Sequence, residues 1–384
     1  MEFHLAARHY RTGAPMRIAV ADGRFAAFEL WTGPAAGLPW IAPGLVDLQV
    51  NGFGGADFNR LPADPAAWAR AHGALAAHGC TRFLATLITH APDEGEALLR
   101  ALAARRAESP GGCLGFHLEG PFLNPDPGTR GAHDAARMIP ADLSLLARWQ
   151  AAAGGAVRLV TLAPEIAPER ALPFLRQLRA AGVRAAIGHS LAMGPALADA
   201  VEAGADAWIH LGNALPRQID KFENPFFHVL ADERLRAFLI PDGLHVPPPA
   251  FRALARALGP RLLLTTDAMS AAGAAGEGPF TLGAQEVAVA ADGRATQPGT
   301  GRLAGSTLTP FRGVFQAAAL SGLPWNDLWD AFSLRPAAWI GLSHGLEKGM
   351  PADFCLFDTE REPRLRSVYR DGERLSGEEP EEAV

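Results

Sequence analysis

Short apolar segments alternate with helical stretches along most of this chain, and this alternation restricts its fold more than any other feature. Stretches such as 94–106 and 169–181 carry apolar residues at helical spacing. This order predicts parallel strands joined by helical crossovers. We predict strands at residues 44–50, 82–88, 113–118, 157–162, 183–187, 207–210, 236–240 and 261–266. Eight βα units fit a (β/α)8 barrel better than a doubly wound sheet.

The two ends of the chain have a different pattern from the middle. Strand-like segments separated by turns gather there, at residues 16–20, 25–30, 353–357 and 366–371. We therefore predict a small β-sandwich domain formed by both chain ends, residues 1–41 and 346–384. The barrel then occupies residues 42–345, with a hairpin inserted near 280–300.

Composition and charge exclude several classes of function. The formal net charge is -6, so the chain has no basic field that would hold a nucleic-acid backbone. No apolar run reaches the ~18–20 residues of a membrane helix, and the first residues, MEFHLAARHYRTG, lack the pattern of a signal peptide. The cysteines form no CxxC pair that would indicate a structural zinc site. We expect a soluble, cytoplasmic protein that binds neither nucleic acid nor membrane.

Strong polar residues follow nearly every predicted strand. In a barrel these carboxyl ends share one face, where active sites lie. Glu119, His189 and His210 stand at three such ends and offer the ligand types of a catalytic zinc site, with a fourth position for water. A divalent ion there would lower the pKa of that water and polarise a carbonyl oxygen. Asp267 would then act as general base and acid, and His245 would bind the oxyanion or the substrate.

Each of these residues also has a structural interpretation. A buried histidine is more often part of a core than a ligand, Glu119 could cap a turn, and Asp267 could cap a helix. Because all of them stand at strand ends, the structural interpretation of the whole set is the weaker one. Glu165, which follows the 157–162 strand, fits a structural role and a site role equally well.

At these residues the chain resembles the N-acetylglucosamine-6-phosphate deacetylases of the amidohydrolase superfamily. The matching segments follow one another in order along nearly the whole chain: PGLVDLQVNGFGGADFN (43–59), HLEGPFLNP (117–125), TLAPE (161–165), GHS (188–190), HLGNALP (210–216), PDGLHV (241–246), TTDAMSAAG (265–273) and LAGSTLTP (303–310). The resemblance implies a metal-dependent (β/α)8 barrel with a small β domain made from both chain ends, assembled as a homodimer.

The resemblance also implies roles for individual residues. It makes Glu119, His189 and His210 the metal ligands, and Asp267 the carboxylate that transfers the proton. It places further residues around the sugar and its acetyl group, namely Ala132, His133, Asn213, Ala214, His245, Leu303 and Ala304.

The number of metal ions follows from what stands at the first strand end. Many amidohydrolases carry a His-x-His pair there to hold a second metal, whereas this chain has Gln49-Val-Asn51. No lysine ends the 157–162 strand, which disfavours a site with a bridging carboxylated lysine. We therefore expect one divalent ion, Zn²⁺, with Fe²⁺, Co²⁺ and Mn²⁺ as alternatives.

The chain departs from the family pattern in the segment after HLGNALP. Family members often have an arginine near the position of Lys221, which is donated across the dimer to the sugar phosphate. Lys221 would supply the charge without the bidentate geometry, and Arg217 is a second candidate. The loop 124–133 is also longer than is typical.

We expect hydrolysis of the acetamide of N-acetylglucosamine-6-phosphate to acetate and glucosamine-6-phosphate, a step of amino-sugar breakdown. One alternative is a deacetylase or other amidohydrolase with the same barrel that acts on a different, unphosphorylated or otherwise built, N-acyl substrate. Loss of activity toward only the phosphorylated sugar on Lys221→Ala would favour the first interpretation. A second alternative is a catalytically silent carbohydrate-binding homologue, which metal-dependent turnover would exclude.

Overall fold

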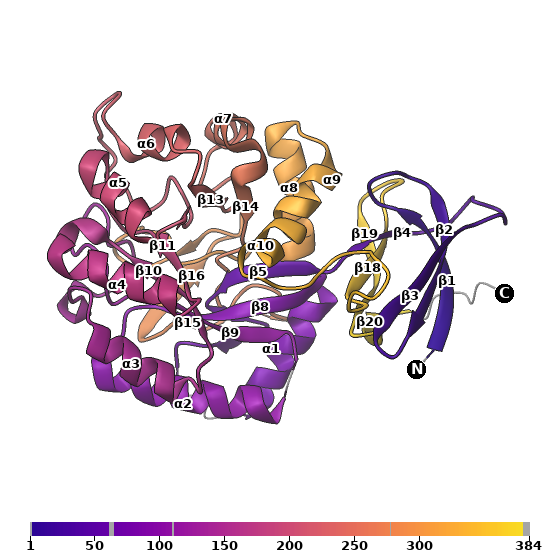
Figure 1. Cartoon of the computed structure of the whole chain (residues 1–384), viewed down its shortest axis with the longest axis horizontal. Coiled ribbons are helices and arrows are strands. Elements are labelled where there is room, and N and C mark those ends of the chain that lie inside the picture. Colours follow the sequence, from indigo (N-terminus) through magenta and orange to yellow (C-terminus); the bar gives the residue numbers. More distant parts are fainter. Residues whose placement is uncertain (1, 61–64, 110, 277, 379–384) are drawn as a thin grey trace.

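The structure is a computed structural model that describes residues 2–60, 65–109, 111–276 and 278–378. A barrel surrounded by helices makes up most of the molecule, and a smaller β domain stands beside it (Figure 1). Residue 1 and residues 379–384, which belong to the range predicted for the small domain, lie outside the described residues.

The barrel is one sheet of parallel strands whose order in space follows their order in the sequence. From one edge to the other the strands are β5 (Leu45–Val50), β8 (Cys80–Leu87), β9 (Cys113–Glu119), β10 (Val157–Leu162), β11 (Arg184–Ile187), β12 (Ala207–Trp208), β13 (Arg236–Leu239) and β14 (Leu262–Leu264). Every one of them falls on a predicted strand, so the (β/α)8 prediction is confirmed.

The helices form the outer ring of the barrel (Figure 1). They are α1 (Pro65–Ala77), α2 (Pro92–Glu108), α3 (Leu143–Ala152), α4 (Pro168–Ala180), α5 (Gly194–Ala203), α6 (Pro225–Ala231), α7 (Pro248–Leu258), α8 (Pro310–Ser321), α9 (Trp325–Ala331) and α10 (Leu334–Trp339), with 3₁₀ turns η1 (Ala135–Arg137), η2 (Pro164–Ile166) and η3 (Gly259–Arg261). Most begin at proline, whose fixed φ suits a first helical turn. None of the helices described is both long and apolar enough to cross a membrane.

The barrel core consists of an inner and an outer apolar layer. Inside the barrel, Leu48, Leu159 and Phe238 belong to a buried cluster against which Trp339 of α10 packs, with its ring 5.3 Å from that of Phe238. A larger cluster, which includes Phe174 of α4, lies between the strands and the helices. Since these layers fill the strand bodies, the polar residues are concentrated at the carboxyl ends.

The barrel closes between its first and last strands largely through side chains. Asp47 of β5 accepts hydrogen bonds from the hydroxyl groups of Thr265 and Thr266 and from the Thr266 N–H. Beyond them Val50 forms a parallel bridge with Ala268. We call this junction the seam; it places the end of β5 beside the residues that follow β14.

The small domain is a single sheet in the order β20-β19-β18-β4-β1-β2-β3. Its strands come from the two ends of the chain: β1 (Glu2–His9), β2 (Pro15–Ala21), β3 (Arg24–Leu30), β4 (Trp40–Pro43), β18 (Phe354–Asp358), β19 (Arg364–Arg370) and β20 (Glu373–Gly377). Phe25 of β3 packs on Phe354 of β18, although the two strands are not neighbours in the sheet. The sheet therefore folds over a core of its own, as a sandwich does.

The insertion near residues 280–300 is a three-stranded antiparallel sheet, β15 (Phe280–Leu282), β16 (Gln285–Val289) and β17 (Ala295–Thr296). A short ribbon, β6 (Gly52–Phe53) and β7 (Ala56–Asp57), lies after β5. Gln285 donates a hydrogen bond to the Ala132 carbonyl, so the insertion contacts the loop that follows β9. It therefore stands at the carboxyl ends of the barrel strands.

Candidate metal centre and active site

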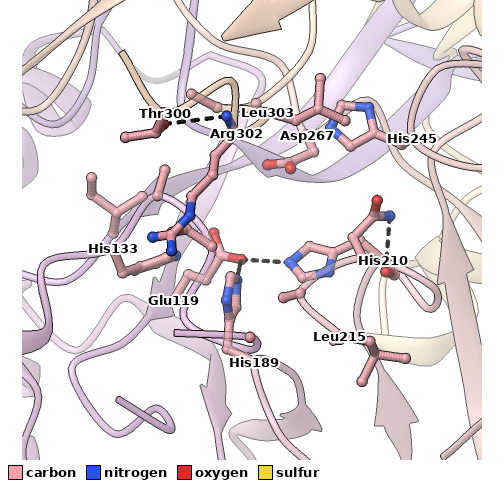
Figure 2. Close-up of a pocket in the computed structure, with 18 of the residues that line it drawn as sticks. Glu119, His133, His189, His210, Leu215, His245, Asp267, Thr300, Arg302 and Leu303 are labelled. Atoms are coloured by element: carbon pink, nitrogen blue, oxygen red, sulfur yellow. Dashed lines mark hydrogen bonds and ion pairs between the residues drawn. The ribbon is translucent and has the colours of Figure 1, made fainter. Parts of the chain in front are cut away.

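A pocket of about 510 Å³ opens at the carboxyl ends of the barrel strands (Figure 2). All but one of the site residues expected from the sequence line it, namely Glu119, Ala132, His133, His189, His210, Asn213, Ala214, His245, Asp267, Leu303 and Ala304. The exception, Lys221, lies outside the lining, and its Nζ stands 5.5 Å from the centre of the Phe222 ring. The pocket therefore collects side chains from strand ends that are far apart in the sequence.

Three potential metal ligands meet at the base of this pocket. The Nε2 atoms of His189 and His210 lie 3.1 and 2.9 Å from the same oxygen, Oε1 of Glu119. All three side chains are buried, and their ligand atoms lie within 4.8 Å of one another. One carboxylate and two imidazoles at this spacing suit a divalent ion such as zinc and leave coordination positions for other groups.

The neighbours of His189 prepare it to act as a ligand. Its Nδ1 donates a hydrogen bond of 2.9 Å to the carbonyl oxygen of Thr129, so Nε2 is the nitrogen left facing Glu119. His133 packs edge-on against the same ring, with the centroids 4.4 Å apart. A histidine that binds a metal through one ring nitrogen typically donates a hydrogen bond from the other ring nitrogen. The donor set and its support therefore fit a divalent ion.

Electrostatic shifts distinguish the two carboxylates of the pocket. Burial raises the pKa of Glu119, but hydrogen bonds and positive charge from His189 and His210 outweigh it and hold that pKa well below its usual value. Burial, together with the nearby charge of Glu119, raises the pKa of Asp267 to about 8. Without a cation, Glu119 is thus the ionised carboxylate and Asp267 the group that keeps its proton.

The backbone is strained where these side chains leave the strands. His189, His210 and Asp267 have φ of 49°, 29° and 50°, and Ala214 has φ of 53°. Residues other than glycine rarely adopt this left-handed backbone conformation, and such strain concentrates at functional sites. His210 already stands in this turn, which is why β12 ends at Trp208 and not at the predicted residue 210.

His245 is held by an aspartate of its own loop. Oδ2 of Asp242 accepts a hydrogen bond of 2.6 Å from Nδ1 of His245, and Oδ1 accepts from the backbone N–H of Leu244 and of His245. Burial raises the pKa of Asp242, yet these hydrogen bonds and the charge of His245 bring it below its usual value. The loop therefore fixes His245, and no described residue hydrogen-bonds to its Nε2.

Glu165 has a structural role in this arrangement. Its two carboxylate oxygens accept hydrogen bonds from the Ser190 hydroxyl, the Leu191 N–H and the Asn124 side chain. It does not line the pocket. It ties the turn that follows β11, and so His189, to the loop that follows β9.

Asn51 and Arg302 line the pocket although neither was assigned a role in the site from the sequence. Asn51 stands at the end of β5 and donates a hydrogen bond to Asp267. Arg302 extends over the pocket from the segment after β17 (Figure 2) and donates to the carbonyl oxygens of Gly131 and Pro127. The strand-end position was a signal for Asn51, whereas nothing local to Arg302 distinguishes it from the many other arginines of the chain.

Comparison with known proteins gives consistent matches. A model of the family described as "Amidohydrolase family" matches residues 40–375. The human N-acetylglucosamine-6-phosphate deacetylase is 35% identical over 356 residues, which cover 87% of this chain and 82% of that protein. An N-acetylgalactosamine-6-phosphate deacetylase of Escherichia coli O157:H7 is 32% identical over 332 residues, 85% of each chain.

A solved structure is similar over nearly the whole length of this chain. It is a variant of the N-acetylglucosamine-6-phosphate deacetylase of Mycobacterium smegmatis, in complex with N-acetyl-D-glucosamine-6-phosphate. It superposes with a TM-score of 0.87 at 34% identity, covering 97% of this chain and 99% of the other. The similarity therefore includes the small domain as well as the barrel.

Proposed function

The chain belongs to the amidohydrolase family, and from this premise we propose that it hydrolyses the acetamide of N-acetylglucosamine-6-phosphate. Acetate and glucosamine-6-phosphate are the products. The observation that carries the proposal is the convergence of Glu119, His189, His210 and Asp267 in one pocket at the carboxyl ends of the strands. The pocket volume, about 510 Å³, is within the range of small-molecule sites.

Glu119, His189 and His210 would hold one divalent ion, for which zinc is our first choice. When bound, such an ion lowers the pKa of water and polarises a carbonyl oxygen. The two imidazoles and the single carboxylate favour a borderline metal over magnesium or calcium. Gln49 and Asn51, at the end of β5, offer no imidazole to a second ion.

Asp267 transfers the proton in the proposed reaction. Water adds to the acetyl carbon, the C–N bond breaks, and the nitrogen leaves as an amine. Asp267 takes the proton from the water and then gives one to the leaving nitrogen, which makes it a much better leaving group. His245, fixed by Asp242, would present Nε2 to the oxygen that becomes negative or to the sugar.

The walls of the pocket would bind the sugar and its acetyl group. We place Ala132 and His133 over the sugar, Asn213 and Ala214 against its polar groups, and Leu303 and Ala304 beside the acetyl group.

Two arginines support the proposal that the pocket mouth binds the 6-phosphate. Arg217 and Arg302 both line the pocket. The two arginines lie where two loops meet. Gly128 of one loop is so close to Pro216 of the other that a Cβ added to the glycine would lie 2.9 Å from the proline ring. Arg302 donates to the carbonyl of Pro127, next to that contact, and Arg217 follows Pro216. Guanidinium groups bind phosphate with directed pairs of N–H groups.

We propose a homodimer through the segment that carries Lys221. Phe222 and Phe227 of this segment are 70% and 51% exposed, which is unusual for phenylalanine and typical of a surface that a partner covers. Burial of this surface in a homodimer would bring Lys221 toward the pocket of the second subunit, where its charge would add to that of the arginines.

We also propose a cytoplasmic location. Cys80, Cys113 and Cys355 are buried free thiols, which suits a reducing compartment.

The experiment is to measure acetate release from N-acetylglucosamine-6-phosphate, from its galactosamine epimer and from N-acetylglucosamine. Zinc-loaded and chelator-stripped protein would be compared. We expect metal-dependent release from N-acetylglucosamine-6-phosphate with little from the unphosphorylated sugar. Preference for the epimer or for an unphosphorylated N-acyl sugar would show that this sugar, and not N-acetylglucosamine-6-phosphate, is the substrate. Binding of the sugar without release of acetate would favour a catalytically silent carbohydrate-binding protein.

A further inference from the structure

Asn51 is a buried asparagine whose backbone and side chain serve different partners. Its N–H donates to the carbonyl of Ala268 across the seam, and its carbonyl accepts from Phe58 and from the Asn59 side chain. The side-chain amide, in contrast, makes a hydrogen bond of 2.7 Å from Nδ2 to Oδ1 of Asp267. Within the described part of the chain its Oδ1 has no partner. A change of the side chain would therefore leave the backbone bonds of the seam in place.

Asparagine is a costly choice at this position if its role is structural. The residue is only 2% exposed, and a buried oxygen without a partner destabilises a folded chain. Leucine has nearly the same shape and would remove the unpaired amide oxygen, but it would also remove the hydrogen bond to Asp267. Since Asn51 also lines the pocket, the polar group has a reason to be there in what it does for Asp267.

Asp267 depends on Asn51 for its orientation. The backbone of Asp267 is fixed, because its carbonyl accepts from Ser306 and its neighbour Ala268 pairs with the end of β5. Among the described residues, the hydrogen bond from Asn51 is the one made to the carboxylate itself. With Oδ1 held in this way, Oδ2 is the oxygen left to face the reacting groups.

We infer that Asn51 is a positioning residue for the proposed hydrolysis, one that holds Oδ1 of Asp267 so that Oδ2 carries the proton from water to the leaving nitrogen. The inference rests on the proposed function. In this role the amide N–H of Asn51 increases the rate of the reaction and does not contribute to binding of the sugar or the metal.

The test is the variant Asn51→Leu, assayed with the holoenzyme. We expect kcat to fall about 10- to 100-fold, the effect of losing one hydrogen bond to a charged group. KM, metal content and Tm should stay close to the wild-type values. Asn51→Gln keeps an amide N–H and should recover part of the lost kcat.

Gln49→Leu is the matched control. Gln49 stands two residues earlier on β5, is equally buried at 2%, and its amide atoms have no partner within the described residues. It should keep the wild-type kcat. Wild-type kcat in Asn51→Leu would overturn the inference, and so would an equal loss in Gln49→Leu, which would indicate general disturbance of the seam.

The wild-type protein separates this inference from the proposed function. If it releases acetate from N-acetylglucosamine-6-phosphate while Asn51→Leu does so equally well, the inference fails and the function stands. If the wild type acts on the epimer or on an unphosphorylated N-acyl sugar, the substrate is wrong and the same variants are judged on that sugar. If it hydrolyses none of them, both fail.

Discussion

Metal binding should displace a proton from Asp267, and Asp267→Asn should abolish that release. Burial and the charge of Glu119 raise the pKa of Asp267 to about 8, so at pH 7 its carboxyl is about nine-tenths protonated in the metal-free protein. A divalent ion held by Glu119, His189 and His210 favours the ionised form of a nearby carboxylate. Because the raised pKa belongs to the metal-free state, metal affinity should increase with pH up to about 8 and level off above it.

Calorimetric titration of zinc in buffers of different ionisation enthalpy measures the number of protons released. The wild type should release about 0.9 proton more than Asp267→Asn at pH 7, and only about 0.1 more at pH 9. Protons that leave the three ligands appear in both proteins and cancel in the difference. Equal release by both proteins at pH 7 would refute the reasoning, whatever the activity of the variant.

Three further predictions concern the pocket mouth, the metal and the seam. Arg302→Ala should raise KM for the phosphorylated sugar about tenfold or more and leave turnover of N-acetylglucosamine unchanged. An equal effect on both sugars would show that Arg302 does not bind the phosphate. Glu119→Gln should lower the metal content measured by elemental analysis from one ion to well below one, and full occupancy would contradict its role as a ligand. Burial raises the pKa of Asp47 from 3.8 to about 6, so its contribution to stability is complete below pH 4 and is lost as pH rises through 6. Asp47→Asn should therefore gain about 2 kcal/mol relative to wild type in urea unfolding between pH 4 and pH 7, and a constant difference would exclude this shift.

The barrel could be predicted from the sequence because each strand and each helix is indicated by a short continuous stretch of residues. Each apolar run, such as 157–162, is long enough to identify a buried strand, and the parallel order follows from the helices between the runs. The strand ends could be predicted for the same reason, since Glu119, His189 and His210 directly follow or end such runs. The shortness of β12 could not, because it depends on the left-handed backbone of His210.

Features that depend on distant parts of the chain could not be predicted. Arg302 reaches the pocket because an inserted sheet packs on the loop after β9, and no local pattern records that contact. Asn51 was visible at a strand end, but only as a residue that cannot bind a second metal. Its bond to Asp267 requires the first and last strands to be adjacent, which is a property of the closed barrel.

The order of strands in the small domain has a consequence for synthesis of the protein. β4 pairs on one side with β1 and on the other with β18, a strand from the far end of the chain. At about 5–20 residues per second, the roughly 300 residues between β4 and β18 take on the order of 15–60 s to translate. During that interval the edge of β4 is unpaired on the ribosome, and an unpaired edge can join to another chain. We expect the nascent protein to need a chaperone over this interval, whereas chains refolded from denaturant have both ends present from the start.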